Sequence, residues 1–155
     1  MEEVLKIISK RLTDKNINWV LGGSLNLAIQ GVNVIPHDID ILTNQKGALA
    51  IQKELDEFTQ ESVVYKESDL FKSWLGVFEI NGVKVEIMGD LSSRASIHDN
   101  WRPPTKLKNP VYITYQDLTI PVKSLKEEYG AYTRMGRTEK AEKIKSCLKG
   151  LSFEA

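Results

Sequence analysis

The stretch VLGGSLNLAIQGVNVIPHDIDIL occupies residues 20–42 and decides the fold. Its first apolar run ends at Gly22-Gly23, which predicts a buried strand entering a tight turn. Ser24 is an N-cap residue for a short helix that Gly31 stops. At the far end, residues 38–42 begin by alternating strictly between acidic and apolar side chains, as a half-buried strand does. The stretch therefore predicts a strand, a turn, a helix and a second strand.

The glycine turn has a chemistry of its own. Glycines at residues 22 and 23 let the backbone approach a ligand closely, and the start of a helix presents free N–H groups with a positive dipole end. This arrangement suits a phosphate group. A Gly-Gly-Ser turn with no ligand is the simpler alternative, and the residues alone leave both open.

Asp38 and Asp40 share one face of the second strand. Residues two apart in a strand have Cα atoms about 7 Å apart, so the two carboxylates can converge on a hard cation such as Mg²⁺. The alternative is a solvated strand face. Aspartate is depleted in strands, however, and like charges on one face repel each other unless a cation lies between them.

Glu86 belongs to the second strand of a predicted hairpin. The runs 74–80 and 83–88 flank Asn81-Gly82, a dipeptide that accepts the positive φ angles of a tight hairpin turn. If this hairpin lies beside the strand of the two aspartates, Glu86 adds a third carboxylate to their face. The alternative is a solvent-facing Glu86 that pairs with Lys84.

The remaining pattern predicts an α+β fold, a small mixed β-sheet flanked by helices, with further helices at the C-terminus. Residues 1–155 are expected to form a single domain, with its core at 18–90 and a C-terminal helical segment at 123–150. Residues 92–110 are polar and irregular. Helices are predicted at 3–15, 46–58, 124–134 and 138–149, and further strands at 19–21, 63–65, 111–115 and 118–122.

The composition bounds the function. The chain has 155 residues with 21 Lys+Arg and 21 Asp+Glu, so it lacks the basic excess of typical nucleic-acid or membrane-surface binders. Its charged start predicts no signal peptide, no apolar run approaches the roughly 20 residues of a membrane span, and Cys147 has no internal disulfide partner. We therefore expect a cytoplasmic protein that binds neither membranes nor polymeric nucleic acid.

The zero net charge is a cancellation. Residues 1–98 hold 10 basic and 14 acidic residues, and residues 99–155 hold 11 and 7. A carboxylate-bearing core followed by a basic C-terminal third suits a site that binds metal from one side and phosphate from the other.

The order of these features resembles the nucleotidyltransferase superfamily that shares the palm of DNA polymerase beta. Its signature is a Gly-Ser or Gly-Gly-x turn, a short helix, two aspartates alternating with apolar residues, and a third carboxylate downstream. Residues 20–42 look like this signature throughout, and Pro36-His37 before Asp38 is similar to the lincosamide and aminoglycoside nucleotidyltransferases. The spacing from Ser24 to Asp38 also favours that antibiotic-modifying branch.

The resemblance implies a role for each residue. Asp38 and Asp40 would ligate two Mg²⁺ ions, and Glu86 would share one ion or act as the base on the acceptor hydroxyl. Gly22, Gly23 and Ser24 would hold the β- and γ-phosphates of a nucleoside triphosphate such as ATP. A nucleoside monophosphate would pass to a hydroxyl of an unidentified small-molecule or protein acceptor, with release of pyrophosphate.

The C-terminal helices carry three further candidates, Arg134, Arg137 and Lys140. Their positive charges would neutralise the triphosphate if the helices close over the site. The alternative is a docking helix with a solvated basic face.

Two other functions stay open at this point. The first is a catalytically inactive module of the same fold that binds a nucleotide or a protein partner, as in a toxin–antitoxin or defence system. The second is a structural domain in which the two aspartates are merely solvated.

Overall fold

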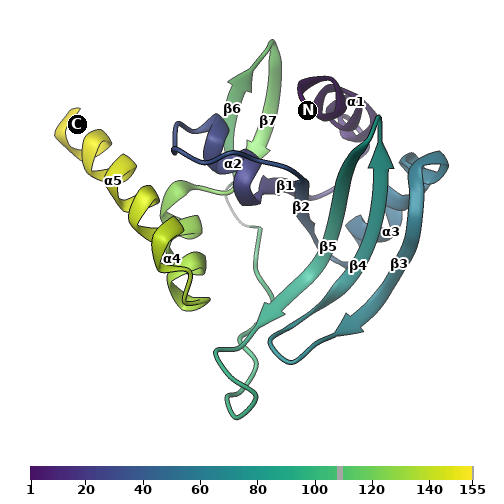
Figure 1. Cartoon of the computed structure of the whole chain (residues 1–155). Coiled ribbons are helices and arrows are strands. Elements are labelled where there is room, and N and C mark those ends of the chain that lie inside the picture. The colour runs from purple at the N-terminus through teal and green to yellow at the C-terminus, as the bar shows by residue number, and fades with distance from the viewer. Residues whose placement is uncertain (108–109, 155) are drawn as a thin grey trace.

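The computed structural model describes residues 1–107 and 110–154, and in them a single mixed sheet forms the centre of the molecule (Figure 1). Its strands lie in the order β3-β4-β5-β2-β1-β7-β6. Strands β2 and β5 are parallel, as are β1 and β7, and every other neighbouring pair is antiparallel. The bounds are β1 Trp19–Gly22, β2 Ile39–Thr43, β3 Thr59–Glu67, β4 Phe71–Ile80, β5 Val83–Ser93, β6 Val111–Tyr115 and β7 Leu118–Val122.

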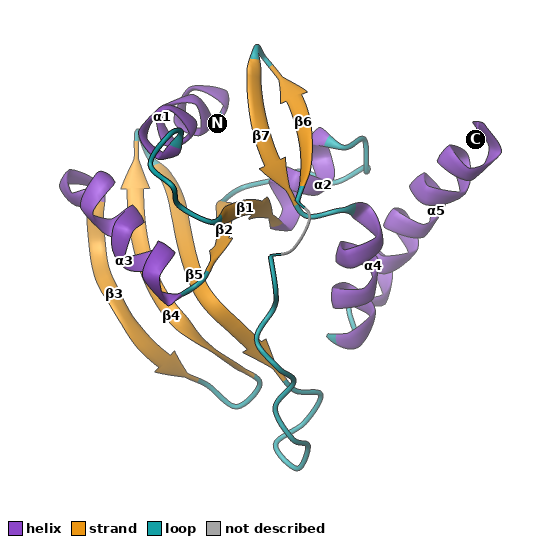
Figure 2. Cartoon of the chain, turned by 180° about the vertical axis from the view of Figure 1, so that it is seen from behind, coloured by secondary structure: helices purple, strands orange, loops and turns teal. Residues whose placement is uncertain are grey.

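Helices cover both faces of this sheet. The first and third helices lie on the face seen in Figure 2, the second lies on the opposite face, and the last two form a pair beside it. The predicted α+β class, with a mixed sheet and C-terminal helices, is confirmed. The bounds are α1 Glu2–Leu12, α2 Gly23–Ile29, α3 Gln45–Glu54, α4 Leu125–Arg134 and α5 Thr138–Glu154, with a 3₁₀ turn, η1, at Asp56–Phe58.

Alternation along the central strands builds the main core. Ile39 and Ile41 of β2 are fully buried, and they pack in one cluster with Leu5 of α1 and Ile51 of α3. Each such side chain contributes about 1.5–3 kcal/mol when it leaves water. Because side chains alternate along a strand, burial of these isoleucines turns the intervening Asp40 to the opposite face.

A second, smaller core holds the C-terminal helices in place. Leu27 of α2 and Val32 after it pack with Leu125 of α4 and with Ala141 and Ile144 of α5. The helix pair is therefore anchored to the segment that follows the glycine turn.

The hairpin prediction is confirmed in detail. Asn81 and Gly82 have φ angles of 49° and 80°, and Ile80 pairs directly with Val83 across the turn. Both strands continue well beyond the predicted ends, to Phe71 on one side and Ser93 on the other, which gives the long, curved β4–β5 ribbon of Figure 1.

Several predicted boundaries are wrong. The first helix ends at Leu12 rather than residue 15, because Thr13 is extended and Asp14 has a φ of 62°. The helix predicted at 46–58 ends at Glu54, where a 3₁₀ turn follows. Ser24 is not the N-cap of α2: Gly22 is, and Ser24 lies in the first turn.

No helix in the described part of the chain is long and apolar enough to cross a bilayer.

Shortening a buried side chain of the central strand β2 should destabilise the protein. We expect Ile41→Ala to lower the free energy of unfolding by about 2–5 kcal/mol, because it leaves a cavity in a fully buried site. Ile35→Ala is the matched control: this side chain is 80% exposed, and its removal should cost less than about 0.5 kcal/mol. Urea denaturation measures both, and equal losses would contradict this account of the core.

Candidate functional site

Strand register places two carboxylates and a glycine in one row. Asp40 of β2 lies opposite Gly22 of β1 on one side and opposite Glu86 of β5 on the other. Neighbouring strands are about 4.8 Å apart, and directly paired residues in parallel strands turn their side chains to the same face. The structure therefore brings Asp40 and Glu86 together, as the sequence predicted.

The remaining predicted carboxylate, Asp38, is not part of this row. Asp38 precedes β2 and is exposed, although it lines the same cleft as Asp40 and Glu86. Glu86 Oε1 lies 2.8 Å from Lys84 Nζ, so the ion pair named as the alternative for Glu86 also forms. Within residues 1–107 and 110–154, no three Asp, Glu, His or Cys side chains are grouped closely enough to hold a metal ion together.

The surroundings of Asp40 disfavour its ionised form. Burial, and next the neighbouring charges of Glu86 and Asp38, raise the pKa of Asp40 from its ordinary value of 3.8 to about 6. Each effect penalises the ionised form, the first by desolvation and the others by repulsion. A cation placed between these carboxylates would reverse the repulsion.

Gly23 is required at the turn for two reasons. Its φ of +69° lies in the left-handed region, which residues with a Cβ enter only at a cost. A Cβ at this position would also clash with Oδ2 of Asp40, which shows how closely the turn approaches the carboxylate. The glycine turn and the aspartate strand therefore form one site.

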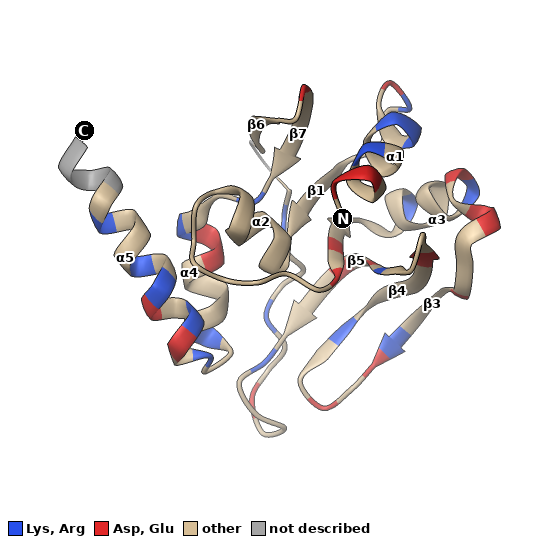
Figure 3. Ribbon diagram, turned by 45° about the horizontal axis from the view of Figure 1, so that its top comes forward, with Lys and Arg blue, Asp and Glu red and all other residues tan. Residues whose placement is uncertain are grey.

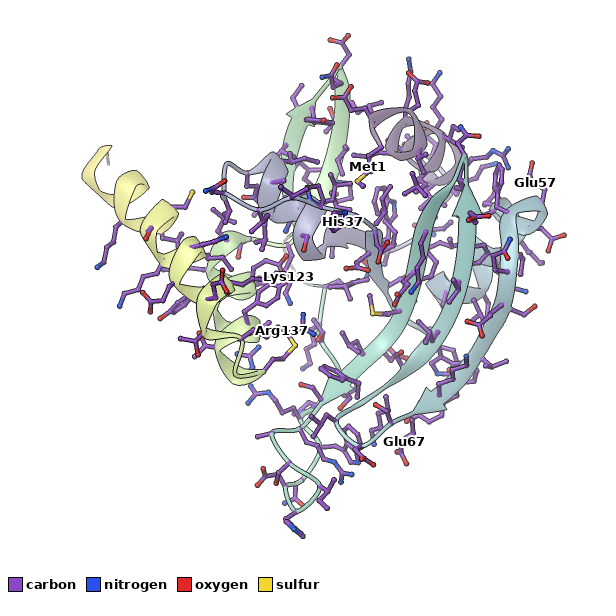
Figure 4. The ribbon with its side chains drawn as sticks, viewed as in Figure 1. Met1, His37, Glu57, Glu67, Lys123 and Arg137 are labelled. Atoms are coloured by element: carbon purple, nitrogen blue, oxygen red, sulfur yellow. The ribbon has the colours of Figure 1, made fainter. Side chains whose placement is uncertain are left out.

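Residues from α4 and α5 reach this turn from the other side. Lys140 Nζ lies 3.0 Å from Ser24 Oγ and 5.4 Å from the centre of the Tyr132 ring. The Arg137 guanidinium lies 5.9 Å from that ring, and Figure 4 shows Arg137 and Lys123 between the helix pair and the curved sheet. Burial, and next the charge of Glu128, raises the pKa of Tyr132 to about 12.

Arg134 is the last residue of α4, two positions after Tyr132. It lines the cleft, but it also borders a second hollow with Arg102, and burial followed by the charge of Arg102 lowers its pKa. In Figure 3 the acidic residues coloured on α5 lie near its beginning, and only lysines are coloured beyond them toward its end. Of the three predicted phosphate ligands, Lys140 lies at hydrogen-bond distance from the turn, and Arg134 and Arg137 line the cleft.

Sequence reasoning missed Glu128. It is 3% exposed, it accepts a hydrogen bond of 3.0 Å from Asn26 Nδ2, and its Oε1 lies 3.7 Å from Lys123 Nζ. Burial raises its pKa despite these partners. The available signal was its spacing, because Leu125, Glu128 and Tyr132 fall on one buried helix face, where a carboxylate is unexpected.

These residues surround a cleft of about 540 Å³ between the curved β4–β5 ribbon and α4. The two predicted aspartates, Glu86 and Gly23 are among the residues that line it. The cleft is thus large enough for a small ligand, and the predicted catalytic residues form part of its lining.

Comparison with known proteins agrees with this geometry. A model of the aminoglycoside-2''-adenylyltransferase family matches residues 4–147. A candidate nucleotidyltransferase from Thermotoga maritima is 40% identical, with a TM-score of 0.82 over 96% of this chain and 92% of that one. No curated protein sequence matches the chain.

Two antibiotic-modifying enzymes share the fold at low identity. The lincosamide antibiotic adenylyltransferase LnuA, solved with lincomycin bound, is 16% identical with a TM-score of 0.61, covering 95% of this chain and 98% of that one. ANT(2'')-Ia, solved with adenylyl-2''-tobramycin, is 10% identical with a TM-score of 0.58, covering 98% and 91%. At these identities the likeness establishes the fold alone.

The two glycines of the turn should differ sharply in tolerance. We expect Gly23→Ala to lower the free energy of unfolding by about 1–3 kcal/mol, because it forces a positive φ and a clash with Asp40. Gly22→Ala is the control, since its φ is −125° and its new Cβ would meet only the flexible Leu42 side chain at 3.1 Å. Urea denaturation of both variants provides the comparison. A larger loss in Gly22→Ala would contradict the geometry.

Removing the charge of Asp40 should stabilise the metal-free protein. The raised pKa means that the folded state binds more protons than the unfolded state between pH 3.8 and about 6, so this group lowers stability as pH rises through that window. Asp40→Asn should therefore be more stable than the wild type at pH 7.5 by about 1–3 kcal/mol.

The measurement is urea denaturation in EDTA at several pH values. Because both side chains are neutral below pH 3.8, the gain from Asp40→Asn should shrink toward zero there. A stability difference that does not change with pH would show that Asp40 carries no repulsive charge in the folded state.

Proposed function

The chain belongs to the aminoglycoside-2''-adenylyltransferase family, and from this membership we propose that it is a Mg²⁺-dependent nucleotidyltransferase. In the proposed reaction, ATP donates AMP to a hydroxyl group of a small molecule and releases pyrophosphate. Two distant relatives of the same fold were solved with lincomycin and with adenylyl-2''-tobramycin, which supports a small-molecule acceptor.

The observation that carries the proposal is the row formed by Gly22, Asp40 and Glu86, with Gly23 pressed against the Asp40 carboxylate. A solvated strand face would not need a glycine whose Cβ position is occupied by an aspartate oxygen. The arrangement puts the turn proposed to hold phosphate directly beside the proposed metal ligands.

The residues at this position fit Mg²⁺. Asp38, Asp40 and Glu86 offer only carboxylate oxygens, the ligands this ion prefers. Burial first, and next the charges of Glu86 and Asp38, raise the pKa of Asp40, and a divalent cation would offset both penalties on its ionised form. When bound, Mg²⁺ would polarise the phosphate oxygens and stabilise the charge that develops on them. To join the ligand set, Glu86 has to exchange its contact with Lys84 for the metal.

The opposite side of the turn supplies positive charge. Lys140 lies at hydrogen-bond distance from Ser24, and Arg137 lines the cleft nearby. We assign the β- and γ-phosphates to Gly22, Gly23 and Ser24, with Arg137 and Lys140 offsetting their charge. Arg134 lies between this position and the second hollow, so we give it a smaller share of the binding.

The chemical step balances with these groups. The acceptor oxygen bonds to the α-phosphorus of ATP while the bond from that phosphorus to the β-bridging oxygen breaks, and pyrophosphate leaves with the electron pair. The hydroxyl proton passes to Glu86, whose carboxylate lies next to Asp40 in the row. Holding both reactants in line is the main contribution of the site.

The proposal is tested by pyrophosphate release from ATP in the presence of Mg²⁺ and a panel of hydroxyl acceptors that includes lincomycin and tobramycin. Asp40→Asn and Glu86→Gln should each lower the rate by about 100-fold or more, because each removes a carboxylate from the row. EDTA should abolish the wild-type rate.

Glu79→Gln is the matched control. Glu79 lies on β4 opposite Lys84, is exposed, and is not among the residues lining the cleft, so its rate should stay within about twofold of the wild type. Calorimetry with Mg²⁺ and a non-hydrolysable ATP analogue runs in parallel. Nucleotide binding without turnover on any acceptor would favour the inactive module, and absence of both would overturn the proposed function.

A further inference from the structure

The sheet side of the cleft carries a group of apolar side chains next to the carboxylate row, and Ser73 and Ser93 also line this side. Leu42 of β2, Met88 of β5 and Leu75 of β4 pair in a row directly beside Asp40 and Glu86, two residues farther along β2 and β5. Met88 and Leu75 are only half-buried, so they present surface to the cleft they line. Farther along the ribbon, Phe71 and Leu91 continue the same lining.

The facing wall is mixed in character. From α4, Ala131 and Tyr132 line the cleft, and Met135 follows at the helix end, beside the charged Glu128, Arg134 and Arg137. Apolar surface on both sides, with charged groups on one of them, therefore flanks the space next to the proposed catalytic row. An acceptor with no apolar part would bury little of this apolar surface, so the surface would contribute little to its binding free energy.

The charges along the cleft point the same way. It contains four carboxylates, and three of them are the proposed metal ligands. The fourth, Glu128, is already held by Lys123 and Asn26. No other carboxylate among the described residues lines the cleft, whereas Arg134 and Arg137 do. The acceptor region thus has no negative charge to offer a polycation.

We infer that the acceptor is an amphipathic hydroxyl compound, neutral or anionic, whose apolar part rests on Leu42, Leu75 and Met88. This inference rests on the proposed function, since it takes the carboxylate row to be where the acceptor hydroxyl reacts. It separates this chain from the polycationic acceptor in the name of its family, because an aminoglycoside carries several ammonium groups that need carboxylate partners.

The test is binding, so it does not depend on turnover. Hexyl β-D-glucoside and methyl β-D-glucoside carry the same ring hydroxyls and differ by five methylene groups, and tobramycin is the polycationic probe. Calorimetry measures all three on the wild type, with and without Mg²⁺ and a non-hydrolysable ATP analogue. One buried methylene is worth about fourfold in affinity, so the hexyl glycoside should bind at least about tenfold tighter than the methyl glycoside even with partial burial.

Truncation of the wall locates the binding. Leu75→Ala and Met88→Ala should each weaken hexyl glucoside at least about threefold while leaving binding of the ATP analogue unchanged. Leu70→Ala is the control, because Leu70 is 38% exposed and is not among the cleft-lining residues. Two variants are used so that a folding defect in one does not decide the result.

Three results would overturn the inference: equal affinity for both glycosides, tighter binding of tobramycin than of hexyl glucoside, or competition between hexyl glucoside and the ATP analogue. The last would assign the wall to the nucleobase. Failure of the proposed function has a different signature, namely no binding of Mg²⁺ with the ATP analogue and no pyrophosphate release, whatever the glycosides do.

Discussion

The pairing register of three strands is the constraint on which the site depends. Asp40 faces Gly22 and Glu86 only while β2 keeps its place between β1 and β5. A shift of one residue would turn Ile39 and Ile41 out of the core and bury the aspartate. The same strand register therefore buries the isoleucines and aligns the carboxylates. Because losing the register would cost the burial of the core, the packing of the core also holds the carboxylate row in place.

Much of this arrangement is predictable from residues 20–42 and the hairpin. Strict alternation at residues 38–41 assigns the face of each side chain, and Asn81-Gly82 accepts the positive φ angles that the turn adopts. The ends of α1 and α3 are harder to predict, because the residues that end them, Thr13 and Leu55, are neither glycine nor proline. Ser24 is not the cap of α2, because Gly22, which has no side chain, takes that position.

The rest of the site depends on contacts that sequence patterns do not encode. Lys140 reaches Ser24 across 116 positions in the chain, and Asn26 meets Glu128 across 102. The apolar lining of the cleft depends on the same kind of information: Leu42, Leu75 and Met88 lie in predicted strands but are brought side by side by strand pairing, and Phe71 and Leu91 lie where β4 and β5 run past their predicted ends. Contacts between residues far apart in the sequence place these side chains, and local propensity carries no information about such contacts.

Glu128 has a consequence for how the family to which this chain belongs can vary. Its carboxylate joins α4 to Asn26 of α2 and to Lys123 in one buried group, so replacing any single member leaves a polar or charged atom without its partner. A single substitution at any of these three positions therefore destabilises the junction of α2 and α4. The apolar lining residues Leu42, Leu75 and Met88 are not members of this group, so under the proposed function the acceptor preference can change through single substitutions there while the helix pair stays in place.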